Sequence, residues 1–334
     1  MARNGKSGRN ARSRKIARGS RAFAGGALAL GAGVAANSAE AATFTVTNLN
    51  DAGAGSLRQA ISDANGAAGP DIVDFQAALT GTITLTTGQL DITDSVDVQG
   101  PGPAAITVDG NNASRVFYLY STAPLNDVTI SGLTITGGAA TIGAGVVVFE
   151  ENLTLDDVVI TGNAATGDGG GLWADGFALN LNILNSTISG NTSGDDGGGI
   201  YIEDTGGQPL IQNSVISGND AAGSGGGIYF YDPDTAVTIE NSTISGNSAA
   251  GLGGGVYLYD TDAGPLTFRT STIAGNEAVM GGGLAFYGPD HPVVIENSTI
   301  SGNQATLGDG GGLAIYALYA TATIEKAKRK HVLV

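Results

Sequence analysis

The chain has 334 residues, no cysteine and 55 glycines, and its formal net charge is −16. The charges are segregated along the chain. Residues 1–21 contain 8 of the 15 Lys and Arg, and residues 326–334 contain four more. Residues 42–325 therefore contain three Arg and 30 Asp and Glu, which gives this segment a net charge of −27. Such a surface repels nucleic acid and anionic membranes, which excludes both as partners, and attracts cations.

Residues 1–41 have the parts of an export signal. A basic start is followed by the apolar stretch AFAGGALALGAGVAA at 22–36, and Ala39-Glu40-Ala41 supplies a small-x-small cleavage pattern. The apolar stretch is too short to span a bilayer. The pattern predicts a signal peptide over 1–41, a mature chain starting near Ala42 and no transmembrane segment within it. A basic tail on a cytoplasmic protein is the alternative.

Residues 42–100 are expected to form an N-terminal cap and the first irregular coils. Residues 43–49, TFTVTNL, alternate as a strand does, whereas Leu57, Ala60 and Ile61 recur at helical spacing. The open end of a stacked β structure exposes apolar core and unpaired backbone, which a strand and a short helix can cover. Alternating segments at 82–85 and 105–108 predict early coils.

Residues 101–325 carry the feature that decides the fold, a repeat of about 28 residues. A Gly-Asn pair recurs six times at steps of 28, 28, 28, 29 and 27, with its asparagines at Asn163, Asn191, Asn219, Asn247, Asn276 and Asn303. Triple glycines follow at the same period, starting at Gly169, Gly197, Gly225, Gly253, Gly281 and Gly310. A fixed period of this length indicates a stack of near-identical units.

Each unit has three short runs with strand character, as at 186–191, 200–202 and 237–239. Helix is disfavoured because triple glycine is costly in one. Three strands per unit predict a coil, and successive coils would stack by parallel pairing about 4.8 Å apart. The predicted fold is all-β, a right-handed parallel β-helix, because parallel crossovers are almost always right-handed.

The recurring asparagines are interpreted as structural ladders. Asn tolerates left-handed backbone geometry at turns, and stacked amides can bond from coil to coil. A second column has the same interpretation; it is interrupted once by Thr270 and contains Asn185, Asn213, Asn241 and Asn297.

The Gly-Gly-Gly-Ile/Leu/Val segments, paired with Ile-x-Gly-Asn, resemble the repeat of the polymorphic outer membrane proteins and related bacterial β-helix surface proteins of pectin-lyase-like fold. Residues 45–61 are similar to the Leu-Arg-Glu-Ala segment that opens many of them, with Gln59 replacing the Glu and Gly55 the usual Cys. The resemblance covers residues 43–325 and implies an exported, often adhesive protein of a Gram-negative-type bacterium. Members usually end in an anchor or translocator barrel, which we do not expect here.

Residues 326–334 depart from the repeat. Ile324-Glu325 aligns with Ile295-Glu296, after which Asn-Ser-Thr-Ile is expected, but the chain reads Lys326-Ala327-Lys328-Arg329. We interpret this as a coil broken by frameshift or truncation. A basic tail that blunts an exposed sheet edge is the alternative.

The residue after each inward aliphatic should point outward. This places one aromatic column at Trp173, Tyr201, Tyr229 and Tyr257, and a neighbouring one at Tyr231, Tyr259 and Tyr287, with Asp175 and Glu203 in its earlier coils. Stacked rings would stabilise neighbouring coils. Alternatively, the seven aromatic residues form a carbohydrate platform, and they are the candidate ligand-binding face.

Acidic residues recur in the following turn, among them Asp232, Asp234, Asp260, Asp262 and Asp290. Carboxylates stacked about 4.8 Å apart repel one another unless a cation lies between them, so these five are a candidate weak Ca²⁺ site. The glycine-rich calcium nonapeptide is absent, and no other cofactor is expected.

No catalytic residue is predicted. Pectate-lyase-like enzymes need a base, commonly Arg or Lys, near calcium-binding acids, and Arg269 is the cation of the regular repeats. It shares a column with Glu240 and Glu296, which predicts an ion bridge between two carboxylates. His291 and His331 are isolated, and His291 is expected to be solvated.

The leading hypothesis is a monomeric, exported β-helix at the cell surface, in the outer membrane or outside the cell, adhesin-like and non-catalytic. Its partner would be a polysaccharide or a cell-surface protein of a host or neighbouring cell. The alternative is a polysaccharide-binding or polysaccharide-degrading protein that uses the aromatic and acidic face. A passive structural passenger or a pseudogene product is a third hypothesis.

Overall fold

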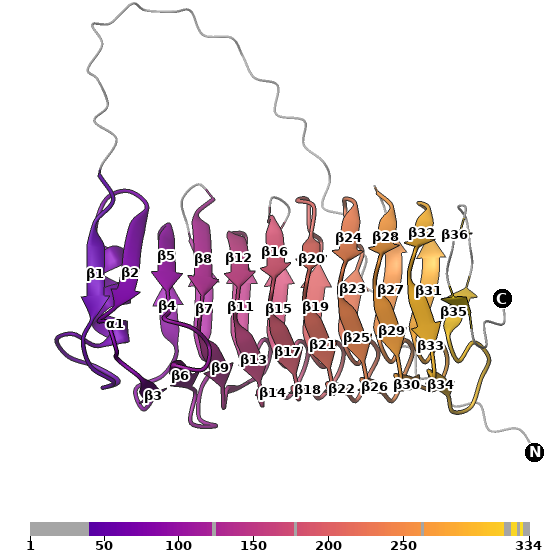
Figure 1. The fold of residues 1–334 in the computed structure, drawn as a ribbon, viewed down its shortest axis with the longest axis horizontal. Coiled ribbons are helices and arrows are strands. Elements are labelled where there is room, and N and C mark those ends of the chain that lie inside the picture. Colours follow the sequence, from indigo (N-terminus) through magenta and orange to yellow (C-terminus); the bar gives the residue numbers. More distant parts are fainter. Residues whose placement is uncertain are drawn as a thin grey trace, which may run out of the picture. The chain divides into compact units, whose positions relative to one another are not determined.

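A computed structural model describes residues 40–121, 125–176, 179–261, 264–316, 322–325 and 328–329. They lie in one compact unit, Ala39–Val334. The chain winds into parallel coils, and each strand pairs with its counterpart in the next coil (Figure 1). Four sheets result, which we call A to D, and a regular coil visits them in the order A, B, D, C.

Sheets A and B hold the strands that precede each Gly-Asn pair. Sheet A consists of β1 (Thr43–Val46), β2 (Asp71–Phe75), β5 (Val96–Gln99), β8 (Asp127–Ser131), β12 (Asn152–Asp156), β16 (Leu181–Leu184), β20 (Leu210–Gln212), β24 (Val237–Glu240), β28 (Leu266–Arg269), β32 (Val293–Glu296) and β36 (Ala322–Glu325). Sheet B consists of β3 (Gly81–Thr84), β6 (Ile106–Asp109), β9 (Thr134–Thr136), β13 (Val159–Thr161), β17 (Thr187–Ser189), β21 (Val215–Ser217), β25 (Thr243–Ser245), β29 (Thr272–Ala274), β33 (Thr299–Ser301) and β37 (Lys328–Arg329).

Sheets C and D complete the coil. Sheet C follows the triple glycines and consists of β4 (Leu90–Ile92), β7 (Phe117–Tyr120), β11 (Val146–Phe149), β15 (Leu172–Asp175), β19 (Ile200–Glu203), β23 (Ile228–Tyr231), β27 (Val256–Thr261), β31 (Leu284–Pro289) and β35 (Leu313–Tyr316). Sheet D has two-residue strands, β10 (Ala139–Ala140), β14 (Ala164–Ala165), β18 (Thr192–Ser193), β22 (Asp220–Ala221), β26 (Ser248–Ala249), β30 (Glu277–Ala278) and β34 (Gln304–Ala305).

The predicted parallel solenoid is confirmed, but three strands per coil was too few. Sheet D was missed because a two-residue strand is too short to show alternation, the pattern by which strands are recognised. The described part of the predicted tail also continues the coil, because Lys328 and Arg329 pair in parallel with Thr299 and Ile300 of β33. Residues 1–39 of the predicted signal lie outside the described residues.

The lumen of the coils is filled by aliphatic and aromatic side chains. Ile200 and Ile202 of β19 and Ile188 of β17 are fully buried, as strand alternation predicts. Phe230, on β23, is among the largest fully buried side chains. Each such burial contributes about 1.5–3 kcal/mol.

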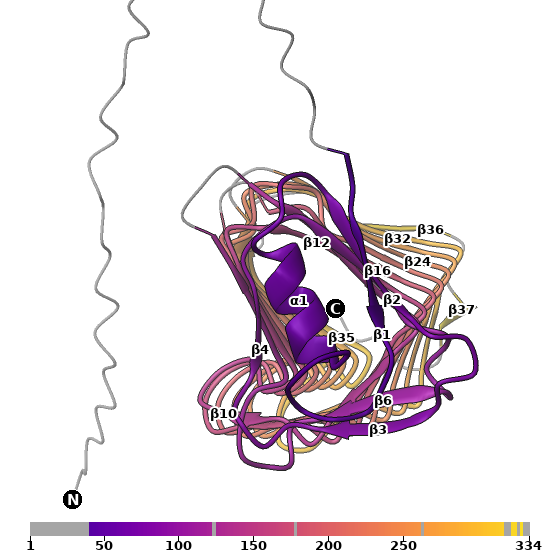
Figure 2. The ribbon, with the colours of Figure 1, turned by 90° about the vertical axis from the view of Figure 1, so that its left-hand side faces the viewer.

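The N-terminal end of the lumen is closed by α1 (Leu57–Ala64), which lies across the coil end in Figure 2. The Ser56 side chain caps the helix by accepting from the Gln59 amide, and Leu57, Ala60 and Ile61 are buried, as the sequence predicted. No helix of the described residues has the length and hydropathy that crossing a membrane requires.

An ion pair ties this cap to the first coils. Arg58 donates to Asp51 (2.7 Å) and to the carbonyls of Gly88 and Gln89 (2.6 Å each). Burial alone would raise the pKa of Asp51, but hydrogen bonds from Arg58 and from the turn at Thr86 and Thr87 outweigh it and hold that pKa well below its usual range.

The Gly-Asn asparagines form the predicted ladder inside the coil wall. Asn219 Oδ1 accepts from both the backbone amide and Nδ2 of Asn191, each at 3.0 Å. Asn219 Nδ2 donates to Asn247 Oδ1 and to the Ile188 carbonyl, also at 3.0 Å. From Asn163 to Asn276 the ladder is at most 1% exposed.

A second buried ladder lies at the entry to sheet B. Its members are Ser186, Ser214, Ser242, Ser271 and Ser298, and each of the first four donates its amide to the hydroxyl oxygen of the next at 3.0–3.2 Å. Strands β17 to β29 of sheet B are therefore held at both ends by side-chain hydrogen bonds.

The second asparagine column lies at an exposed left-handed turn, as predicted. The φ angles of Asn185, Asn213, Asn241 and Asn297 are 49°, 52°, 50° and 49°. Thr270 adopts the same conformation, with φ 52°, although β-branched residues strongly disfavour it.

The triple glycines are explained by close approach between coils. Gly225 has φ +67°, a backbone conformation that other residues rarely adopt. A Cβ on Gly226 would lie 2.2 Å from the Ser248 carbonyl oxygen, and a Cβ on Gly227 would lie 2.5 Å from the Gly255 carbonyl oxygen. Both distances are too short for a side chain to fit.

Candidate functional site

The outward side chains of sheet C form two columns in register. The inner column runs through Tyr118, Val147, Trp173, Tyr201, Tyr229, Tyr257, Ala285 and Ala314, and the outer column through Tyr120, Phe149, Asp175, Glu203, Tyr231, Tyr259, Tyr287 and Tyr316. The inner column packs as a hydrophobic cluster separate from the lumen core. The sequence therefore placed these aromatic residues on the correct side of the strands.

The inner column is nevertheless buried. Trp173, Tyr201, Tyr229 and Tyr257 are 8%, 7%, 6% and 6% exposed. Residues from the sheet D side, such as Leu252, pack against the cluster. Burial also raises the pKa of the Tyr201 and Tyr229 hydroxyls. These rings cannot serve as an exposed carbohydrate platform, which corrects that part of the predicted ligand face.

The outer column provides the exposed rings. Tyr259 and Tyr287 are 36% and 44% exposed, and Tyr231 is partly buried. The ring centroids of Tyr231 and Tyr259 are 5.4 Å apart, with an interplanar angle of 7°. Those of Tyr259 and Tyr287 are also 5.4 Å apart, with an interplanar angle of 3°. Parallel rings this close stack on one another. Their faces are directed partly at neighbouring coils, so edges and hydroxyls make up much of the exposed surface.

Two carboxylates interrupt the outer column between Phe149 and Tyr231. Asp175 of β15 pairs in register with Glu203 of β19. Burial, followed by repulsion from Asp204 and Glu150, raises the pKa of Asp175 to about 6. Burial, followed by repulsion from Asp175, raises the pKa of Glu203 to about 7, although a hydrogen bond from the Tyr201 hydroxyl opposes this.

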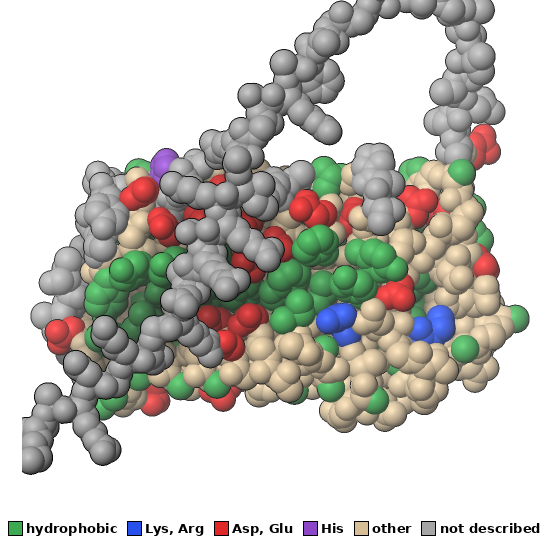
Figure 3. Space-filling view, turned by 180° about the vertical axis from the view of Figure 1, so that it is seen from behind, with side chains coloured by type: hydrophobic (Ala, Val, Ile, Leu, Met, Phe, Trp, Pro, Cys, Tyr) green, Lys and Arg blue, Asp and Glu red, His purple; other side chains and the backbone are tan. Residues whose placement is uncertain are grey.

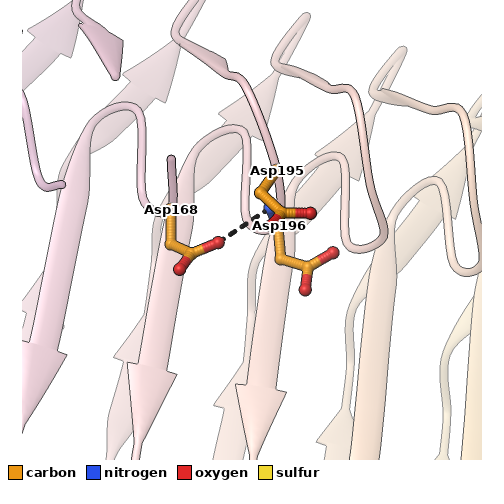
Figure 4. Close-up of side chains that lie close together, drawn as sticks. All are labelled: Asp168, Asp195 and Asp196. Carbon is orange, nitrogen blue, oxygen red and sulfur yellow. Dashed lines mark hydrogen bonds between the residues drawn. The ribbon is translucent and has the colours of Figure 1, made fainter. Parts of the chain in front are cut away.

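A second acidic group lies in the turns before the triple glycines. Asp168, Asp195 and Asp196 each place a carboxylate oxygen within 4.8 Å of the others (Figure 4). The Asp196 amide donates to Asp168 (3.0 Å), and the Ser224 amide donates to Asp196 (2.6 Å). Carboxylate oxygens are the ligands that Ca²⁺ prefers. The signal that could have found this group is the acid that directly precedes Gly169 and Gly197.

The residues named from the sequence for calcium lie elsewhere. Asp232 directly follows β23 and Asp260 lies near the end of β27, and both have left-handed backbone conformations, with φ 47° and 60°. Asp234 and Asp290 are partly or fully exposed, and Asp262 and His331 lie outside the described residues. Among the described acids, these four do not form a group of the closeness seen at Asp168, Asp195 and Asp196. Calcium binding at this turn stays a prediction.

Arg269 bridges two acids as the sequence predicted. Its guanidinium lies 3.1 Å from Glu296 and 3.8 Å from Glu240, in neighbouring coils of sheet A. Arg269 thus has a structural position on a different sheet from the aromatic columns.

Figure 3 shows the face over sheet C, where a band of hydrophobic side chains has acidic side chains along its borders. We call this band, comprising the two columns of sheet C, the aromatic band. Its acidic borders come from Asp168, Asp195 and Asp196 on one side and Asp204, Asp232 and Asp260 on the other.

The family model described as the right-handed β-helix region matches residues 104–300, more than half of the chain. The chain belongs to this family. This right-handed β-helix therefore has the handedness that the sequence predicted.

Two solved structures are similar to this β-helix. The crystal structure of pectate lyase Pel9A is 16% identical, with a TM-score of 0.48, over 86% of this chain and 78% of that chain. The A-module of the Azotobacter vinelandii mannuronan C-5 epimerase AlgE6 is 14% identical, with a TM-score of 0.28, over 86% of this chain and 100% of that chain. Likeness at these levels assigns no activity to the β-helix. No curated protein matches the sequence.

Proposed function

We propose that this protein is a non-catalytic, adhesin-like interaction protein that presents the aromatic band to a basic surface of a partner protein. The observation that carries the proposal is the stack of Tyr231, Tyr259 and Tyr287 beside carboxylates, in which Tyr259 and Tyr287 are exposed, in a chain segment with net charge −27. Aromatic rings and carboxylates both attract Lys and Arg side chains, through cation–π contacts and charge-assisted hydrogen bonds.

Extended stacking favours protein contact over sugar recognition. A sugar ring packs on an open aromatic face, but the faces of Tyr259 and Tyr287 are directed partly at neighbouring rings. The hydroxyls and edges that remain accept and donate hydrogen bonds without needing a flat ligand.

The test measures binding of the full-length protein to poly-L-lysine and to a glycan array, each with and without Ca²⁺. The Tyr259→Ala/Tyr287→Ala variant should weaken poly-L-lysine binding about tenfold, as loss of about 1.4 kcal/mol does. The control, Thr238→Ala/Thr267→Ala on sheet A of the adjoining coils, should bind as the parent does. Binding to glycans that the tyrosine variant abolishes, with no affinity for poly-L-lysine, would replace the proposal with carbohydrate recognition.

A second candidate function, polysaccharide cleavage, is favoured by one observation. Asp175 and Glu203 are paired carboxyl groups with pKa values of about 6 and about 7, which suits general acid–base chemistry near neutral pH. Release of reducing ends or unsaturated products from polysaccharides, lost in both Asp175→Asn and Glu203→Gln, would support it. Unchanged release in both variants would reject these residues as the catalytic pair.

We further propose that the protein is exported to the cell surface, in keeping with the resemblance of its repeats to polymorphic outer membrane proteins. The sequence of residues 1–41 supports this. Expression in a Gram-negative host should yield an exported chain whose first residue is Ala42. A full-length chain retained in the cytoplasm would contradict it.

A further inference from the structure

Sheet B has an outer face of a different chemistry, made of two in-register columns across strands β9 to β33. The columns contain Thr134, Val159, Thr187, Val215, Thr243, Thr272 and Thr299, and beside them Thr136, Thr161, Ser189, Ser217, Ser245, Ala274 and Ser301. We call these residues the hydroxyl face. All are at least partly exposed, and Val215 is 39% exposed.

Between β9 and β33 the hydroxyl face carries no charged residue, although residues 42–325 have a net charge of −27. Charged residues mark its two ends, because Asp109 of β6 pairs with Thr136 and Lys328 of β37 pairs with Thr299. Acidic residues lie at outward positions of the neighbouring sheets, for example Glu240 on sheet A and Glu277 on sheet D. Charge complementarity therefore favours an uncharged occupant for this face.

The side chains of the hydroxyl face form a two-dimensional array. Parallel pairing repeats each position about 4.8 Å away in the next coil, and alternate residues of one strand are about 6.6 Å apart. A ligand that matches this array must itself have a surface that repeats in two dimensions. A single flexible glycan or peptide has no such surface.

The array is rigid before anything binds. Each strand from β17 to β29 is held by the buried serine ladder where it begins and by the buried asparagine ladder just after it ends, as at Ser214 and Asn219 around β21. Thr and Val side chains are also stiff at χ1, so little conformational entropy is lost when they are immobilised.

We propose that the hydroxyl face binds ice. Methyl groups restrict the orientation of the water beside them, and a Thr or Ser hydroxyl can both donate and accept hydrogen bonds, as a water molecule of the lattice does. Thr134 and Ser189 already donate within the protein, to the Pro103 carbonyl and to the Thr161 hydroxyl, so they present acceptors to the ice. The oxygen repeat of hexagonal ice is close to the spacing of strands in a parallel sheet, so in-register hydroxyls can match a crystal plane. The face lacks the aromatic rings on which sugars stack.

The test uses the full-length protein in an ice recrystallisation assay and in observation of single ice crystals during slow cooling. The parent should shape ice crystals and slow recrystallisation. Thr243→Tyr/Thr272→Tyr places two bulky rings in the centre of the array and should lower the activity about tenfold or more, equivalent to about 1.4 kcal/mol of lost binding free energy.

The matched control is Thr238→Tyr/Thr267→Tyr, the same change at paired positions of β24 and β28 on sheet A. It should keep the parental activity, and circular dichroism melting should show both variants folded. Thr243→Val/Thr272→Val, which keeps the shape but removes two hydroxyls, covers the case in which the tyrosine variant fails to fold, and it should weaken the activity.

The proposal fails if the parent leaves ice unaltered relative to serum albumin, or if the sheet A control loses as much activity. Capture of the parent by crystalline cellulose or chitin, with ice unaffected, would reassign the face to polysaccharide.

Discussion

The two asparagine columns of this protein have the same residue type and the same period, yet they stabilise it in different ways. The column from Asn163 to Asn303 is largely buried, and its amides bond head to tail between coils. The column from Asn185 to Asn297 is exposed, and its members share a left-handed backbone. In the first column the side chain is needed for its hydrogen bonds, and in the second chiefly for the backbone angle it tolerates.

Asp175 and Glu203 are carboxyl groups at equivalent positions of neighbouring coils, and they differ from the stacked asparagine amides. An amide both donates and accepts, so a stack of amides is self-satisfying, whereas an ionised carboxylate only accepts. Burial, followed by repulsion from neighbouring carboxylates, raises the pKa values of these two acids.

The largest expected effect is at the buried column. Asn219→Ala should lower the free energy of unfolding by about 2–4 kcal/mol, because it leaves the Asn191 amide and the Ile188 carbonyl unpaired inside the wall. Urea denaturation measures this. Asn213→Ala, at the exposed turn, is the control and should cost about 1 kcal/mol. Equal losses would show that the two columns do not differ as described.

The stacked carboxyl pair should make stability depend on pH. Both pKa values are raised in the folded state, so the folded protein binds more protons than the unfolded chain, and stability falls as pH rises through about 6 to 7. Asp175→Asn/Glu203→Gln should remove about 2 kcal/mol of the difference between pH 5 and pH 8, after allowance for solvent screening. Melting curves at both pH values measure it, and parallel changes in parent and variant would contradict the assignment.

Thr270 interrupts the exposed asparagine column, and restoring Asn at this position should stabilise the protein. Thr270→Asn should raise the free energy of unfolding by about 1 kcal/mol, because Asn tolerates the positive φ that a β-branched residue resists. The reverse change, Asn241→Thr, should cost a similar amount. A Thr270→Asn protein that is less stable than the parent would mean that the threonine side chain has a role of its own.

The smallest effect is expected at Arg269. Its side chain is 49% exposed, so Arg269→Gln should change stability by about 0.5 kcal/mol or less, and the difference should vanish in high salt. A loss that persists in 1 M salt would indicate packing instead of an ion pair.

Much of the fold could be predicted because each coil repeats the same local choices. Alternation at Ile200-Tyr201-Ile202 separates lumen from outside, Gly-Asn marks the turn, and the apolar spacing of Leu57 and Ile61 identifies the cap helix. Sheet D could not be predicted, because two residues have no periodicity to detect.

The candidate site was predictable in position but not in exposure. Alternation placed Tyr229 and Tyr259 on the same side of the sheet, yet one is 6% and the other 36% exposed. The difference arises because residues from the sheet D turns, which come from other parts of each coil, cover the inner column.

By itself, the sequence determined the period, the inward and outward faces and the residues that stack, because in a solenoid each contact is between equivalent positions one coil apart. The tertiary structure decided which outward residues meet solvent and which acids come together. Asp168 lies beside Asp195 and Asp196 only because one coil stacks on the next, and the pKa values of Asp175 and Glu203 depend on burial that no single repeat contains.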